Sequence, residues 1–167
     1  MNKKRILIVD DEIGAARLLK ANLEQTERYE VCVENWPEDA LAAARQFKPD
    51  LVLLDIIMPR WPGGNVADQI DRDPDLKGTP ICFFTAAVRK HGPRSVEEHE
   101  GIISDRPCLA KPASAEEIMQ FIEAEFARAA SVDGAAVPEV APLLEPGAGG
   151  LGERYAAEPY DERRRQA

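Results

Sequence analysis

The sequence predicts an α/β protein in which a mostly parallel sheet carries helices on both faces. The first observation is a set of short, dense runs of branched apolar residues, such as Ile6–Val9 and Leu51–Leu54, which are typical of strands buried on both faces. The second is that such runs alternate five times with segments whose apolar residues recur at helical spacing. This alternation indicates right-handed βαβ units that build one doubly wound sheet.

The first half of the chain is predicted to contain three strands and two helices. The strand over residues 6–9 is followed by a helix with one apolar stripe. That stripe consists of Ala16, Leu18, Leu19 and Leu23. Charged residues alternate with Val31 and Val33, which predicts a shorter edge strand over 30–34. An alanine-rich helix over 40–47 and the buried strand that begins at Leu51 follow.

The second half continues the alternation with one uncertain stretch. Asn65 is the expected N-cap of a helix over 66–72, and an apolar strand follows over 81–84. Residues 88–105 are polar and contain Gly92 and Pro93, with a short helix expected to start at Ser95. A brief strand over 107–110 precedes the clearest helix, which runs to about residue 130. That helix opens with a capping box formed by Ser114 and Glu117.

Composition excludes several classes of protein. The net charge is −9, which argues against binding to nucleic acid or to an anionic membrane surface, since both need a basic face. No apolar run reaches the length of a membrane span, and Asp10–Glu12 interrupts the first apolar run too early for a signal peptide. A cytoplasmic location is therefore expected. Three cysteines without close spacing predict free thiols.

The chain divides into two parts by composition. Residues 1–130 carry the alternating pattern and are expected to form one domain. Residues 131–167 are rich in Ala, Pro and Gly and show no periodicity, so they are expected to be a disordered tail, with one short helix at most.

Polar groups follow four of the predicted strands: Asp10 and Asp11, Asp55, Thr85, and Lys111. Because the carboxyl ends of parallel strands meet at one edge of a sheet, these residues are expected to converge there. Three converging carboxylates suit Mg²⁺, while the lysine and the hydroxyl suit a phosphoryl group. Asp55 stands alone after the central strand, so it is the candidate nucleophile.

These segments, in this order, resemble the receiver domain of two-component response regulators, in the CheY-like superfamily. The matching segments are Ile6–Glu12, Leu53–Pro59 with Gly63, Thr85–Ala86 and Lys111–Pro112. The resemblance extends from Lys4 to about Arg128. It implies a flavodoxin-like, doubly wound fold with a five-stranded parallel sheet in the order 2-1-3-4-5 and five helices.

The resemblance also implies a role for each site residue. Asp55 would accept a phosphoryl group from a sensor histidine kinase or a histidine phosphotransfer protein, with Mg²⁺ as cofactor. Besides Asp55, the metal ligands would be Asp11 directly, Asp10 largely through water, and the backbone carbonyl of Ile57. Lys111 and Thr85 would each contact a phosphoryl oxygen. The Lys111–Pro112 bond is expected to be cis, which would direct Lys111 inward.

The chain departs from the family pattern in three places. Cys108 occupies the position, three residues before the lysine, where the family usually has the Tyr or Phe of its switch. The stretch 88–105 is longer than usual, so a displaced or shortened fourth helix is expected there. Ile57, two residues after Asp55, offers no polar group to assist an attacking water.

We therefore expect a stand-alone response regulator that acts as a phosphoacceptor, with self-catalysed transfer and slow autodephosphorylation, rather than as a conventional enzyme. No DNA-binding output is visible after residue 131, so the output is expected to be contact with a downstream protein. The alternative is a degenerate receiver that is never phosphorylated and acts only as an interaction module. A phosphatase of the haloacid dehalogenase type would need a second Asp where Ile57 stands.

Overall fold

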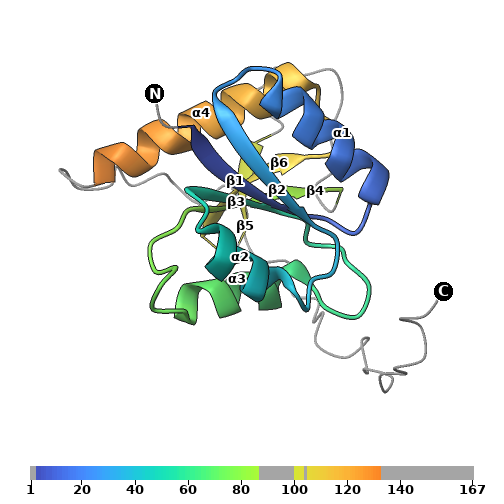
Figure 1. The fold of residues 1–167 in the computed structure, drawn as a ribbon, viewed down its shortest axis with the longest axis vertical. Coiled ribbons are helices and arrows are strands. Elements are labelled where there is room, and N and C mark those ends of the chain that lie inside the picture. The colour runs from blue at the N-terminus through green and yellow to red at the C-terminus, as the bar shows by residue number, and fades with distance from the viewer. Residues whose placement is uncertain (1–2, 87–99, 104, 133–167) are drawn as a thin grey trace. The chain divides into compact units, whose positions relative to one another are not determined.

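The computed structural model describes residues 3–86, 100–103 and 105–132, which form one sheet with helices on both faces (Figure 1). The strands are β1 (Lys4–Val9), β2 (Tyr29–Glu34), β3 (Leu51–Leu54), β4 (Ile81–Thr85), β5 (Glu100–Ile103) and β6 (Arg106–Ala110). The helices are α1 (Ile13–Glu24), α2 (Ala40–Phe47), α3 (Gly63–Arg72) and α4 (Ala115–Val132). The sheet order is β2-β1-β3-β4-β6-β5. Its first five strands are parallel, which confirms the predicted order 2-1-3-4-5.

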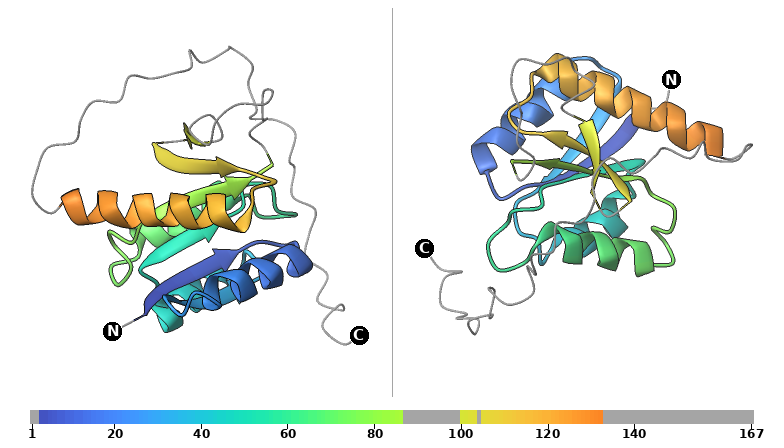
Figure 2. Two further views of the ribbon diagram at one scale, coloured as in Figure 1. Left: turned by 90° about the horizontal axis from the view of Figure 1, so that it is seen from above. Right: turned by 180° about the vertical axis from the view of Figure 1, so that it is seen from behind.

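Two apolar layers hold the helices against the sheet. Successive side chains of a strand point to opposite faces, so Ile6 and Ile8 of β1 pack under α1 and α4, whereas Leu7 and Val9 pack under α2 and α3. β3 repeats this alternation, and all four of its residues are buried. Figures 1 and 2 show α1 and α4 on one face and α2 and α3 on the other. The prediction of strands buried on both faces is therefore confirmed.

The sheet also contains a strand that we did not predict. β5 pairs antiparallel with β6, with Gly101 opposite Cys108 and Ile103 opposite Arg106. A two-residue connection joins the two strands, and Asp105 within it has a φ of 62°, as tight hairpins require. The expectation of a helix is thus wrong for residues 100–103, where the β-branched pair Ile102–Ile103 favours a strand. Residues 87–99, including the expected helix start at Ser95, lie outside the described residues, as does the stretch 133–167.

Three expectations about helices can be compared with the structure. The capping box at α4 is confirmed: the Ser114 N–H donates to Glu117 Oε2 at 2.6 Å, and the Glu117 N–H donates to Ser114 Oγ at 3.2 Å. Leu18 is 64% exposed, so the apolar stripe of α1 is narrower than predicted. The expectation for Asn65 is wrong, because α3 begins at Gly63 with Pro62 in the N-cap position, whose fixed φ already suits a helix entry.

An ion pair between the exposed Arg45 and the buried Asp73 ties α2 to the end of α3. Asp73 follows α3 and is only 4% exposed. Its Oδ2 accepts hydrogen bonds from Arg45 Nε at 2.7 Å and Nη2 at 2.6 Å. Its Oδ1 accepts the Asp75 N–H at 3.0 Å. The carboxylate is thus compensated chiefly by one arginine.

Arg45→Met is expected to lower the free energy of unfolding by about 1.5 kcal/mol. The substitution keeps the apolar stem but leaves the buried Asp73 carboxylate without its cation, and the half-exposed position of Arg45 limits the effect. Urea denaturation at neutral pH measures the change. Arg17→Met, at an exposed position of α1, is the control and should stay within about 0.5 kcal/mol of wild type. Equal stabilities for the two variants would contradict the role of the pair.

The three cysteines are free, as predicted, with Cys82 and Cys108 buried and Cys32 half-buried. Burial raises the pKa of the Cys82 thiol from 9.0 to about 12, and the negative charge of Glu125 adds to this shift.

In the part of the chain that the structure describes, no helix is long and apolar enough to cross a membrane.

The raised pKa of Cys82 predicts a loss of stability at alkaline pH. Below pH 9 the thiol is protonated in the folded and unfolded states alike, whereas between pH 9 and pH 12 only the unfolded state ionises. This group therefore makes the free energy of unfolding fall by up to about 1.4 kcal/mol per pH unit in that window. Cys82→Ala removes the contribution, so its stability difference from wild type should narrow as the pH rises above 9. A difference that stays constant across that window would refute this.

Candidate functional site

The carboxyl ends of four strands bring together the residues that the sequence singled out. Asp10 and Asp11 follow β1, Asp55 follows β3, Thr85 ends β4, and Lys111 follows β6. Main-chain hydrogen bonds continue between these ends: the Asp55 N–H donates to the Val9 carbonyl and the Lys111 N–H to the Thr85 carbonyl, both at 2.9 Å. The predicted convergence at one sheet edge is therefore confirmed.

Three carboxylates form an acidic triad at this edge. One oxygen from each of Asp10, Asp11 and Asp55 lies within 4.8 Å of the other two. Asp10 and Asp55 are buried, and Asp11 is half-buried. Oxygen-only donors at this spacing fit Mg²⁺, which takes few carboxylates and keeps several waters. The clustering of these three carboxylates that the sequence predicted is therefore present.

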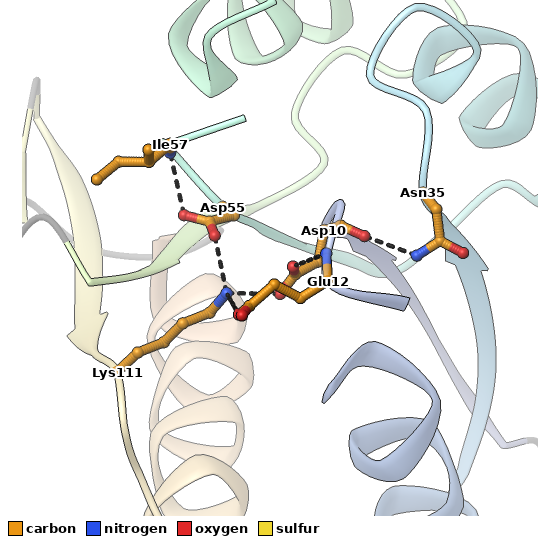
Figure 3. Close-up of polar contacts among 6 residues, drawn as sticks. All are labelled: Asp10, Glu12, Asn35, Asp55, Ile57 and Lys111. Carbon is orange, nitrogen blue, oxygen red and sulfur yellow. Dashed lines mark hydrogen bonds and ion pairs between the residues drawn. The ribbon is translucent and has the colours of Figure 1, made fainter. Parts of the chain in front are cut away.

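Lys111 supplies the positive charge beside the triad. Its Nζ donates to Asp10 Oδ2 at 2.7 Å and to Asp55 Oδ2 at 2.8 Å, and Glu12 Oε2 lies 3.5 Å away (Figure 3). Burial alone would lower the pKa of the Lys111 ammonium, but hydrogen bonds to the two aspartates and their negative charges outweigh burial and raise it. Lys111 is therefore charged throughout the neutral pH range. The expected cis bond between Lys111 and Pro112 is present.

The main chain around Asp55 is closely packed. Asp55 Oδ1 accepts the N–H of Ile57 at 3.1 Å, and the N–H of Gly63 donates to the Ile56 carbonyl at 3.0 Å. A Cβ placed on Gly63 would lie 2.0 Å from the Asp55 carbonyl oxygen. Only glycine allows the start of α3 to approach the main chain after β3 this closely.

The turn after β1 is held by contacts that the sequence did not predict. Asp10 Oδ1 accepts the Glu12 N–H at 2.9 Å, and the Asp10 carbonyl accepts a hydrogen bond from Asn35 Nδ2 at 2.6 Å. Burial raises the pKa of the Asp10 carboxyl, while the hydrogen bonds from Lys111 and Glu12 offset part of this rise. The available signal for Asn35 was its position at the end of the strand next to β1.

The remaining predicted features have distinct surroundings. The Thr85 side chain is fully buried, and the Ile57 side chain is 59% exposed. Cys108, at the position of the family's aromatic residue, is buried in the layer that contains α2 and α3. Lys111 Nζ lies 5.3 Å from the centre of the Phe84 ring, a cation–π contact that the sequence did not suggest. The roles expected for the site residues, including Thr85 and the Ile57 carbonyl, stay predictions.

Together, the doubly wound sheet, the acidic triad and the adjacent lysine define an α/β protein of the receiver type. The family model for the response regulator receiver domain matches residues 6–123. The chain belongs to the response regulator receiver domain family.

Individual relatives match to different extents. Protein PilH from Pseudomonas aeruginosa is 33% identical over 123 residues, which cover 74% of this chain and 98% of PilH. The response regulator PleD from Caulobacter vibrioides is 40% identical over 82 residues, which cover 49% of this chain and 18% of PleD. The chain thus spans only a small part of some of its relatives. Among solved structures, the receiver domain of a LuxO-type repressor from Vibrio parahaemolyticus matches with a TM-score of 0.60 and 25% identity, over 79% of this chain and 96% of that domain.

Proposed function

We propose that this chain is the phosphoacceptor of a two-component phosphorelay, with Asp55 as the phosphorylated residue. The observation that carries the proposal is the position of Lys111 Nζ, within hydrogen-bond distance of both Asp10 and Asp55 at the acidic triad. A buried nucleophilic carboxylate beside a metal-type site and a fixed cation is the arrangement that phosphoryl transfer needs, because this reaction depends on positioning and on neutralising charge.

The proposed reaction uses the chain's own residues as follows. A carboxylate oxygen of Asp55 attacks the phosphorus of a phosphohistidine, and the new P–O bond forms as the P–N bond breaks. The bonding electron pair goes to the imidazole nitrogen, which takes up a proton from water. Lys111 exchanges its contact with Asp55 for one phosphoryl oxygen, and the Thr85 hydroxyl donates to another. Mg²⁺, held by the triad and by the Ile57 carbonyl, would neutralise the remaining phosphoryl charge.

The partners follow from this chemistry. The donor is a sensor histidine kinase or a histidine phosphotransfer protein, and hydrolysis of the acyl phosphate by water resets the domain. The output is contact with a downstream protein in the cytoplasm. The expectation of a stand-alone response regulator stays a prediction. The assignment of residues 131–167 to a disordered tail also stays a prediction.

The proposal is tested by intact-mass measurement after incubation of the full chain with Mg²⁺ and acetyl phosphate. Wild type should gain the mass of one phosphoryl group, and chelation of Mg²⁺ should prevent the gain. Asp55→Ala should abolish it, whereas Asp68→Ala, at an exposed carboxylate of α3, should not. Absence of any gain with acetyl phosphate and with phosphohistidine donors would favour the alternative, a receiver that serves only as an interaction module.

A further inference from the structure

We infer that Asn35 is a positioning residue for the metal-binding pair Asp10 and Asp11, an inference that rests on the proposed function. Asn35 follows β2 and leads into the loop before α2. Its side-chain Nδ2 donates a 2.6 Å hydrogen bond to the backbone carbonyl of Asp10 (Figure 3). Asn35 therefore acts on the main chain between the two acidic residues.

The hydrogen bond extends the β1–β2 ladder by one step. The last paired residues of the two strands are Val9 and Glu34, and beyond them the Asp10 N–H still donates to the Glu34 carbonyl at 3.1 Å. The next acceptor along β1 is the Asp10 carbonyl. Its donor is the Asn35 side chain, which takes the place of a main-chain N–H.

The bonded carbonyl belongs to the peptide unit that joins Asp10 to Asp11. This unit is planar and rigid, and the two side chains leave from its two ends. Its orientation therefore sets the direction of both carboxylates. Asp10 and Asp11 supply two of the three oxygens of the triad, so a rotation of this single plane would displace most of the metal site.

Apart from the bond between the Asp10 N–H and the Glu34 carbonyl, the other main-chain contacts of this turn are local. The Glu12 N–H donates to Asp10 Oδ1 at 2.9 Å, and the Ile13 N–H donates to the Asp11 carbonyl at 3.0 Å. Because these contacts lie within residues 10–13, they would allow the whole turn to rotate as one unit. Asn35 connects this unit to a different strand, and Lys111 reaches the Asp10 carboxylate from the opposite side in Figure 3. Asn35 thus holds the carbonyl of the Asp10–Asp11 peptide, while Lys111 holds the Asp10 carboxylate.

A purely structural role of Asn35 would fix the loop after β2 and would appear in stability alone. A positioning role appears in the affinity for the metal ion. Residues that orient metal ligands typically change affinity 10-fold or more when mutated. We therefore expect the dissociation constant for Mg²⁺ to rise about 10-fold when the Asn35 amide is removed.

Calorimetric titration of the metal-free full chain with Mg²⁺ tests this expectation. Asn35→Ala removes the donor, Asn35→Leu removes it while keeping a similar volume, and Asn65→Ala at an exposed position of α3 is the control. Both Asn35 variants should bind Mg²⁺ about 10-fold more weakly than wild type and the control. Their phosphorylation by acetyl phosphate should be slow at low Mg²⁺ and should recover most of the wild-type rate at saturating Mg²⁺.

The outcomes separate this inference from the proposed function. If wild type is phosphorylated and the folded Asn35 variants bind Mg²⁺ as tightly as wild type, the role of Asn35 is overturned and the proposed function stands. If wild type binds Mg²⁺ but is not phosphorylated on Asp55, the proposed function fails, and the titrations still decide the role of Asn35. If wild type binds no Mg²⁺, both are overturned.

Discussion

Gly63→Ala is expected to lower the free energy of unfolding by about 3 kcal/mol. The added Cβ would lie 2.0 Å from the carbonyl oxygen of Asp55 and 2.9 Å from its carbonyl carbon. Both atoms belong to the main chain after β3, so no side-chain rotation can relieve the overlap. Either α3 moves outward or the Asp55 peptide rotates, and phosphorylation of Asp55 should slow with the second outcome. Urea denaturation and the intact-mass assay measure the two effects.

The neighbouring glycine provides a matched control. Gly64 also lies in the first turn of α3, and a Cβ there has no heavy atom within 4 Å. Gly64→Ala should be neutral or should raise stability by up to about 1 kcal/mol, because alanine is the better helix former. Equal effects of the two substitutions would show that the close approach at Gly63 is not what matters.

Lys111→Met is expected to lower stability by about 3 kcal/mol and to slow phosphorylation of Asp55 by at least about 100-fold. The substitution keeps most of the apolar stem but removes the ammonium that lies 2.7 Å from Asp10 and 2.8 Å from Asp55. Both carboxylates are at most 7% exposed, so little solvent replaces the lost charge. Urea denaturation without Mg²⁺ gives the stability, and intact mass gives the rate.

Two controls accompany this measurement: a second lysine variant and the addition of Mg²⁺. Lys77→Met, at an exposed lysine in the turn before β4, should leave stability within about 0.5 kcal/mol of wild type. Added Mg²⁺ should recover part of the lost stability in Lys111→Met, since a cation at the triad again compensates the carboxylates. An unchanged unfolding free energy in Lys111→Met would contradict the assigned electrostatic role.

The sequence was sufficient to predict most of the candidate site, and the reason is geometrical. Asp10, Asp55 and Lys111 each follow a buried apolar strand, and a parallel sheet places all such positions at one edge. Their convergence therefore required only the strand order and not the details of packing. The glycine at position 63 was part of the family pattern, but the contact that requires it became clear only from the distance to the Asp55 carbonyl.

The features that escaped prediction depend on long-range packing. Asn35 bonds to a main-chain carbonyl 25 residues away. Because every residue has such a carbonyl, the amino-acid sequence does not indicate which one accepts the bond. β5 depends on pairing with β6 through a two-residue connection. The apolar run Ile102–Ile103 is short and follows polar residues, so the sequence pattern did not indicate a strand there. Leu18 lies beside the buried stripe of α1, and whether a flanking position is covered depends on how closely the neighbouring helix packs. These features are set by contacts between segments that lie far apart in the sequence.

β5 changes how movement can pass through the end of the sheet. β6 is bonded to β4 on one side and to β5 on the other, so it is mechanically an interior strand. Any displacement of β6 that begins at Lys111 or at the β4 end near Thr85 must either carry β5 along or break a hydrogen-bonded ladder. The hairpin therefore connects the edge of the sheet that carries Lys111 and Thr85 to residues 100–103 through two hydrogen-bonded ladders, independently of the aromatic residue that Cys108 replaces.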